Sequence, residues 1–79
     1  MCKKIFVEVN AKFDLGGRML PQEIVWEDGR IFSIDKIVDI RQAASLKAGG
    51  QGIRFTCRIG NQEKFLYYEK PYWFVEGKQ

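Results

Sequence analysis

The sequence contains no histidine and only two cysteines, Cys2 and Cys57. The lack of an imidazole excludes Ser-His-Asp and Cys-His arrangements, and with them the commonest routes to hydrolysis near neutral pH. The cysteines have no CxxC spacing and no histidine to complete a zinc site. Neighbouring carboxylates such as Asp35 and Asp39 are interpreted as solvated charges beside Arg and Lys. We therefore expect a protein that is not an enzyme and has no metal or cofactor.

A long apolar run is also absent. No stretch of the chain is apolar over a length that would span a bilayer. Residues 1–8 begin like a signal peptide, but Glu8 and Asn10 interrupt the apolar segment before a hydrophobic region forms. We expect a cytoplasmic protein with no membrane partner.

The chain does hold enough apolar material for one small core. Its 79 residues are 46% hydrophobic and 29% charged, which is typical of a single folded domain over residues 1–79. The 13 Lys and Arg residues exceed the 10 Asp and Glu residues, for a net charge of +3. This mild excess permits a polyanionic partner but does not demand one.

Alternation of apolar and polar residues predicts short strands over residues 4–10, 22–27, 30–35, 53–59, 62–69 and 72–76. Cys57 alternates in register with its apolar neighbours and is expected to be a buried thiol. Asp28-Gly29 between two of these strands predicts a hairpin with a two-residue type I′ turn. That turn would place Glu27 opposite Arg30 and Trp26 opposite Ile31.

The apolar phase changes near Asp35-Lys36, which predicts a bend or bulge there. Bends of this kind allow one sheet to wrap onto itself. With five or six antiparallel strands and short connections, the sequence predicts an all-β fold: a small, strongly bent antiparallel barrel of SH3-like type. An OB-like barrel is the alternative.

One long connection, the glycine-rich loop at residues 42–52, interrupts the strands. Its glycines and the nearby Lys47 suggest a phosphate cradle. However, phosphate-binding loops lead through glycines into a helix, whereas here the glycines follow a predicted helical turn, residues 42–48, and lead into a strand. Gly49 then suits a helix C-cap, and a flexible connection is the favoured interpretation.

The predicted strand at 53–59 has a polar face formed by Arg54, Thr56 and Arg58. If Gly60-Asn61 is a two-residue turn, these residues face Tyr67, Phe65 and Glu63 respectively, which places cations and aromatic rings together outside the core. Such a mixture suits single-stranded nucleic acid. A three-residue turn would direct the two rings inward and leave an ordinary solvated face, and this plainer interpretation is favoured.

The candidate binding residues are Arg41, Lys47, Arg54, Arg58 and Tyr67, and the candidate partner is single-stranded nucleic acid. The alternative is a protein-interaction module that holds a peptide or a second copy. It would use an aromatic surface around Tyr67, Tyr72 and Trp73, or an open strand edge.

The segment 26–41, which begins W-x-x-G-R, is followed by Leu66-Tyr67-Tyr68 and by a closing aromatic strand, Trp73-Phe74-Val75. This pattern resembles a group of uncharacterised small bacterial β domains, some of which lie at the ends of proteins related to Y-family DNA polymerases. A clostridial-type hypothetical protein is similar over more of the length. The chain lacks the tryptophan-rich middle of those domains and has the glycine-rich loop instead. The resemblance implies a small β-barrel fold and no particular activity.

Overall fold

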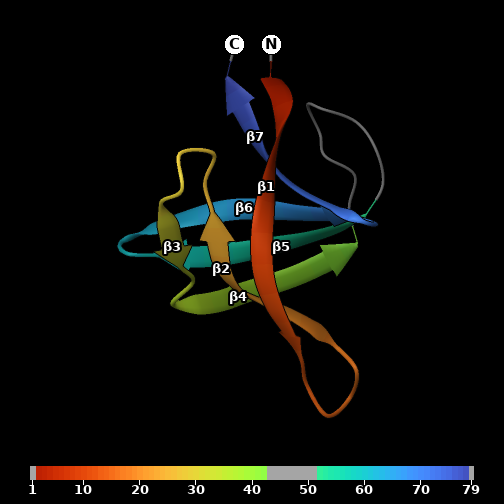
Figure 1. Ribbon diagram of the computed structural model, residues 1–79. Coiled ribbons are helices and arrows are strands. Elements are labelled where there is room, and N and C mark those ends of the chain that lie inside the picture. Colours follow the sequence, from red (N-terminus) through yellow and green to blue (C-terminus); the bar gives the residue numbers. More distant parts are fainter. Residues whose placement is uncertain (1, 43–51, 79) are drawn as a thin grey trace.

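The computed structural model describes residues 2–42 and 52–78. These residues form seven strands (Figure 1): β1 (Cys2–Phe13), β2 (Met19–Val25), β3 (Ile31–Ser33), β4 (Lys36–Gln42), β5 (Ile53–Ile59), β6 (Gln62–Glu69) and β7 (Tyr72–Lys78). They make one antiparallel sheet in the order β3-β2-β1-β7-β6-β5-β4. The sheet is strongly curled, so the predicted all-β class and bent antiparallel architecture are confirmed.

Two long segments produce the curl. The twelve residues of β1 pair with β7 in their first half and with β2 in their second half, and a register shift at Asn10/Ala11 lies within the pairing with β2. Such bulges increase local twist and bend the strand. Because β1 belongs to both halves of the sheet, it lies across the middle of the molecule in Figure 1.

The second long segment runs from β3 into β4 and bends between them. The backbone N–H of Ile34 donates to the carbonyl of Gln22 at 2.9 Å, and the next N–H, that of Asp35, donates to the carbonyl of Arg58 at 2.8 Å. Consecutive residues therefore hydrogen-bond to β2 and to the end of β5, at opposite sides of the sheet. The bend predicted near Asp35-Lys36 is confirmed. It separates β3, within the predicted strand 30–35, from β4, which was not among the predicted strands, and the total is seven strands.

The hairpin that joins β2 to β3 exists, but its predicted register is wrong. Val25 pairs with Ile31, which leaves a three-residue loop, 27–29, and places Trp26 opposite Arg30. Gly29 has φ of 90°, and no non-glycine residue of the described chain has a positive φ. A type I′ turn would require one at Asp28, whereas a type I turn followed by a glycine needs only Gly29.

The side chain of Asp28 stabilises this longer turn. Its carboxylate accepts a hydrogen bond from the backbone N–H of Arg30 at 3.0 Å and one from the Arg30 Nε at 2.7 Å. The backbone hydrogen bond is the main cause of a pKa for Asp28 below its ordinary value. Arg30, predicted to face Glu27, therefore forms an ion pair with Asp28 instead.

The core lies inside the curl. Its buried side chains come from four strands: Ile24, Phe55, Cys57, Leu66 and Trp73. The predicted burial of Cys57 is confirmed, since the residue has no exposed surface. Burial raises the pKa of this thiol to about 11, so Cys57 behaves as a small apolar side chain at neutral pH.

Candidate nucleic-acid interface

The hairpin of β5 and β6 fixes which side chains lie outside the core. Gly60-Asn61 is a two-residue turn, so Arg54 pairs with Tyr67, Thr56 with Phe65 and Arg58 with Glu63. The favoured three-residue turn was therefore wrong. Gly60 has φ of 62°, which suits a two-residue turn with glycine in first place. Its N–H donates to Oδ2 of Asp35 at 2.9 Å, so the bend between β3 and β4 also holds this turn.

A line of five aromatic rings crosses the outer face of β6, β7 and β1. We term it the aromatic row, and it consists of Phe65, Tyr67, Phe74, Phe6 and Tyr72. Neighbouring ring centroids are 6.5, 5.1, 6.1 and 5.6 Å apart in that order. The central pair, Tyr67 and Phe74, is stacked with an interplanar angle of 9°, and the other contacts are edge-to-face. These separations are those of interacting ring pairs.

Exposure differs sharply along the row. Phe65 is 47% exposed, Phe6 57% and Tyr72 61%, whereas Tyr67 is 3% and Phe74 1% exposed. The expectation that Tyr67 is the exposed ring is therefore wrong, because it is stacked on Phe74 within the row. The rings available to a ligand are at the two ends of the row, and the buried pair supports them.

Two cations lie over rings of the row. The guanidinium of Arg54 is 4.7 Å from the centroid of Phe65, and the Lys4 ammonium is 4.8 Å from that of Phe74. Lys4 also pairs with Glu69 at 3.0 Å. The Nε of Arg54 is buried and has no hydrogen-bond partner. The guanidinium of Arg54 is thus held against the ring of Phe65, and this pairing of a ring with a cation is typical of sites for single-stranded nucleic acid.

The other predicted cations lie at the edge of this face or outside the described chain. Arg41 pairs with β5 opposite Arg54 and is held by Asp39 at 2.7 Å, and Arg58 is held by Glu63 at 3.0 Å. Lys47, the cap at Gly49 and residues 43–48 of the predicted helical turn 42–48 lie outside the described residues. The flanking Gln42 ends β4, and residue 53 begins β5.

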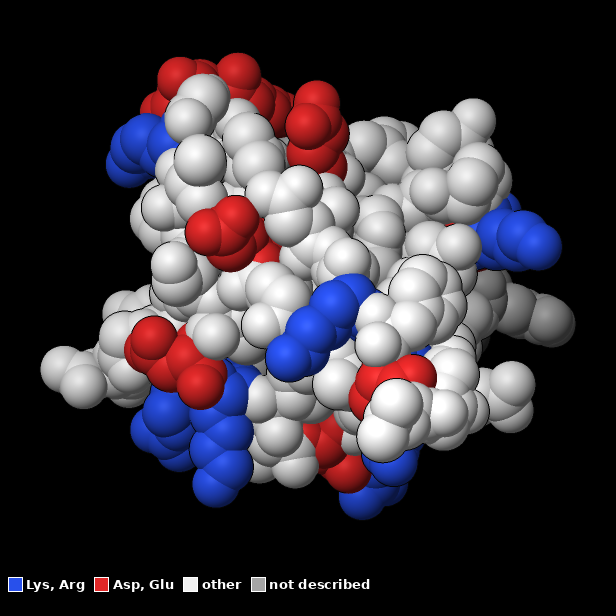
Figure 2. Space-filling model, turned by 60° about the horizontal axis from the view of Figure 1, so that its bottom comes forward, with Lys and Arg blue, Asp and Glu red and all other residues white. Residues whose placement is uncertain are grey.

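Charges of both signs are mixed on the molecule. The hydroxyl of Tyr67 donates to Oε1 of Glu76 at 3.3 Å. Burial is the main cause that raises the pKa of Tyr67 above its ordinary value, and Glu76 acts in the same direction while Arg54 opposes it. On the face that Figure 2 shows, Lys and Arg are interspersed with Asp and Glu rather than gathered into a broad basic patch.

The protein-interaction alternative predicted an aromatic surface formed by Tyr67, Tyr72 and Trp73, and these three rings differ in exposure. Trp73 is 9% exposed and belongs to the core, and Tyr67 is buried in the row, so Tyr72 is the one exposed ring of those three. Sequence reasoning missed Lys4, Phe6 and Phe74 as members of this face. A signal for Phe6 exists, because it is an aromatic residue on the polar side of an alternating strand, between Ile5 and Val7.

The described residues contain no group of three or more His, Cys, Asp or Glu side chains placed to hold a metal ion. Nor do they form any helix with the length and apolar character needed to cross a membrane. The face therefore offers rings, cations and carboxylates as its chemical groups. These suit binding by stacking and by hydrogen bonds.

The chain is similar to small ribosomal subunit proteins. It is 30% identical over 80 residues to small ribosomal subunit protein uS3 of Rickettsia akari, and 29% identical over 80 residues to the proteins of the same name from Rickettsia massiliae and Rickettsia typhi. Each alignment covers 96% of this chain but 35% of the relative, so the chain spans about a third of their length. No family model matches the chain, and no solved structure matches it.

Proposed function

We propose that the protein is a small, non-catalytic nucleic-acid-binding module that holds single-stranded RNA on the outer face of β1, β6 and β7. The observation that carries the proposal is the exposed ring of Phe65 with the guanidinium of Arg54 above it. Single-stranded nucleic acids are commonly held by aromatic rings that stack on bases and by cations that contact phosphates. The likeness to proteins of the small ribosomal subunit, an RNA-containing particle, favours RNA over DNA.

In this proposal the two ends of the aromatic row bind different bases. Phe65 stacks on one base, and the edge-to-face pair of Phe6 and Tyr72 contacts another. The guanidinium of Arg54 then contacts a phosphate. Arg41 and Arg58 must exchange a carboxylate for a phosphate, so they contribute less to affinity than unpaired cations would. We infer that about two to four phosphates are neutralised and that binding weakens moderately as salt rises.

A titration of fluorescently labelled, ten-nucleotide single-stranded RNA, followed by anisotropy, tests the proposal. Loss of one stacking ring costs about 1–3 kcal/mol, so Phe65→Ala is expected to raise the dissociation constant roughly 5- to 150-fold. Phe13→Ala is the matched control, because Phe13 is 69% exposed but belongs to the hairpin between β1 and β2. Equal affinity of the two variants would refute the proposed stacking role of Phe65.

A second candidate is a protein-interaction surface at Phe6 and Tyr72. These adjacent rings are both more than half exposed, and exposed aromatic patches often mark protein contacts. In this case the partner would be a peptide or a second copy of the chain. Sedimentation velocity over a range of concentrations would detect self-association, and Tyr72→Ser would abolish it.

We also infer that the strand connection is SH3-like rather than OB-like. Every pair of neighbouring strands is either consecutive in the chain or formed by the first and last strands. This meander differs from the Greek-key order of an OB-fold. We likewise propose that the protein is related to the small bacterial β domains and that it is located in the cytoplasm.

A further inference from the structure

A cleft opens where β6 and β7 separate. The two strands pair only through Tyr67, Tyr68 and Glu69, opposite residues 72–74. Beyond this point β7 continues along β1, whereas residues 62–66 of β6 continue along β5. The strands share no further pairing, so the inside of the curled sheet is accessible between them.

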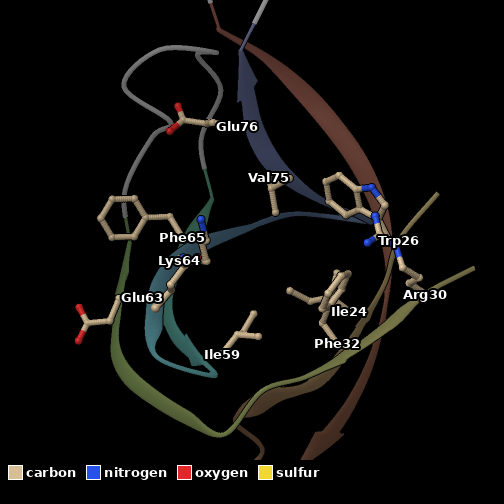
Figure 3. Close-up of a pocket in the computed structure, with 11 residues that line it drawn as sticks. Ile24, Trp26, Arg30, Phe32, Ile59, Glu63, Lys64, Phe65, Val75 and Glu76 are labelled. Atoms are coloured by element: carbon tan, nitrogen blue, oxygen red, sulfur yellow. The ribbon is translucent and has the colours of Figure 1, made fainter. Parts of the chain in front are cut away.

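The cleft has a volume of about 620 Å³. This is within the range of about 300–1,000 Å³ that is typical of small-molecule sites. Its lining residues come from opposite sides of the sheet and include Ile24, Trp26, Phe32, Ile59, Lys64, Phe65 and Val75. In Figure 3 the side chains of Ile24, Ile59 and Val75 point toward a common centre. The cleft is therefore an apolar space that the chain's own core does not fill.

The charged side chains that border the cleft differ in whether other groups already bind them. Two carboxylates border the cleft, but Figure 3 shows both Glu63 and Glu76 directed away from its centre. Glu63 is held by Arg58 at 3.0 Å, and Glu76 accepts the hydroxyl of Tyr67. A ligand in the cleft therefore meets little repulsion from these two groups if it carries a negative charge.

The cations that border the cleft differ in the same way. Arg30 is bound by Asp28 at 2.7 Å and lies 5.5 Å from the ring of Phe32. Lys64, in contrast, has no carboxylate within ion-pairing distance in the described part of the chain. The cleft thus combines an apolar interior with one exposed, unpaired cation at its β6 side.

We propose that this cleft binds a small amphipathic anion, whose apolar body contacts Ile24, Ile59 and Val75 and whose negative headgroup pairs with Lys64. The ligand is a free molecule such as a medium-chain carboxylate. Apolar burial supplies most of the affinity and Lys64 selects the sign of the headgroup. The site lies inside the curl. Phe65, at one end of the aromatic row, also borders the cleft, but the proposed ligand contacts do not involve it and do not depend on RNA binding.

A methyl and amide NMR titration with three ligands of equal chain length tests the charge preference. Octanoate, octanol and octyltrimethylammonium share the apolar body but carry a negative, neutral and positive headgroup. We expect octanoate to shift the methyl signals of Ile24, Ile59 and Val75, with a dissociation constant on the order of millimolar. Octanol should bind more weakly, octyltrimethylammonium most weakly, and the exposed Ile31 and Val38 should show no comparable shifts.

Two matched variants test the role of Lys64. Lys64→Gln is expected to weaken octanoate binding about 1.5- to 5-fold, the range of an exposed ion pair, and to leave octanol binding unchanged. Lys12→Gln removes the same charge from an exposed site on β1 and should change neither. Both sites are exposed, so the folded spectrum is retained.

Three results would overturn the proposal: equal affinity for the three ligands, shifts spread over the exposed methyl groups, or the same effect from both lysine variants. Binding to phosphatidylglycerol vesicles without binding to free octanoate would overturn it as well. Failure of RNA to bind would leave this result unaffected, because the ligands are different and the proposed contacts with Ile24, Ile59, Val75 and Lys64 involve no residue of the aromatic row.

Discussion

Replacement of Gly52 by alanine tests how closely the segment before β5 packs on β6. A Cβ built on Gly52 would collide with the backbone carbonyl oxygen of Tyr68. Because the obstacle is the backbone of β6, which is paired there with both β5 and β7, it cannot rotate away as a side chain would. Overpacking of this kind costs about 1–3 kcal/mol, and we expect a value in the upper half of that range. For a domain of this size this corresponds to a loss of roughly 10–20 °C in Tm.

Urea and thermal unfolding, followed by circular dichroism, would measure the change, with Gly16→Ala as the control. The nearest atom to a Cβ at Gly16 is Oδ1 of Asp14 at 3.4 Å, an ordinary contact. That variant should be neutral or more stable by up to about 1 kcal/mol, since alanine restricts the unfolded chain. If Gly52→Ala were as stable as Gly16→Ala, the close approach to Tyr68 would be refuted.

Two further predictions concern ionisation and salt. The pKa of Cys57 is raised from 9.0 to about 11 in the folded state. The folded protein therefore holds the thiol proton more tightly than the unfolded chain does. Its free energy of unfolding should fall by about 2–3 kcal/mol as the pH rises from 9 to 11. Cys57→Ala, measured by urea unfolding across this range, should lose that part of the slope, and an unchanged slope would contradict the burial argument. For RNA, Arg54→Gln should lower the affinity and reduce the slope of log K against log salt by about 0.7, the value for one phosphate on a single strand. Arg18→Gln, in an exposed loop where Arg18 pairs with Asp14 at 3.5 Å, should leave the slope unchanged.

The two hairpins show that a local sequence pattern predicts the position of a turn but not its length. Asp28-Gly29 and Gly60-Asn61 both predicted a turn, and both turns exist. The loop lengths differ because glycine takes the positive φ in each case, in last place in the first loop and in first place in the second. A glycine-containing pair therefore located each hairpin, but the turn type that sets its register depended on contacts such as the one between Asp28 and Arg30.

The site depended still more on distant residues. Alternation along β6 correctly placed Phe65 and Tyr67 on one face once the turn had two residues. It did not predict that Tyr67 is buried and Phe65 exposed, because the difference arises from Phe74 on β7. Lys4 and Phe6 join the face from the other end of the chain, through the pairing of β1 with β7.

The sequence by itself determined the all-β class, the bend near Asp35 and the burial of Cys57, since each follows from the local pattern of apolar and turn residues. Only the tertiary structure decided which rings of the aromatic row are exposed and that β6 and β7 separate to leave a cleft. The physical reason is that alternation assigns a side chain to one face of a sheet, whereas its exposure depends on which strands lie beside it. In this protein the neighbours that matter most, β1 and β7, come from opposite ends of the chain.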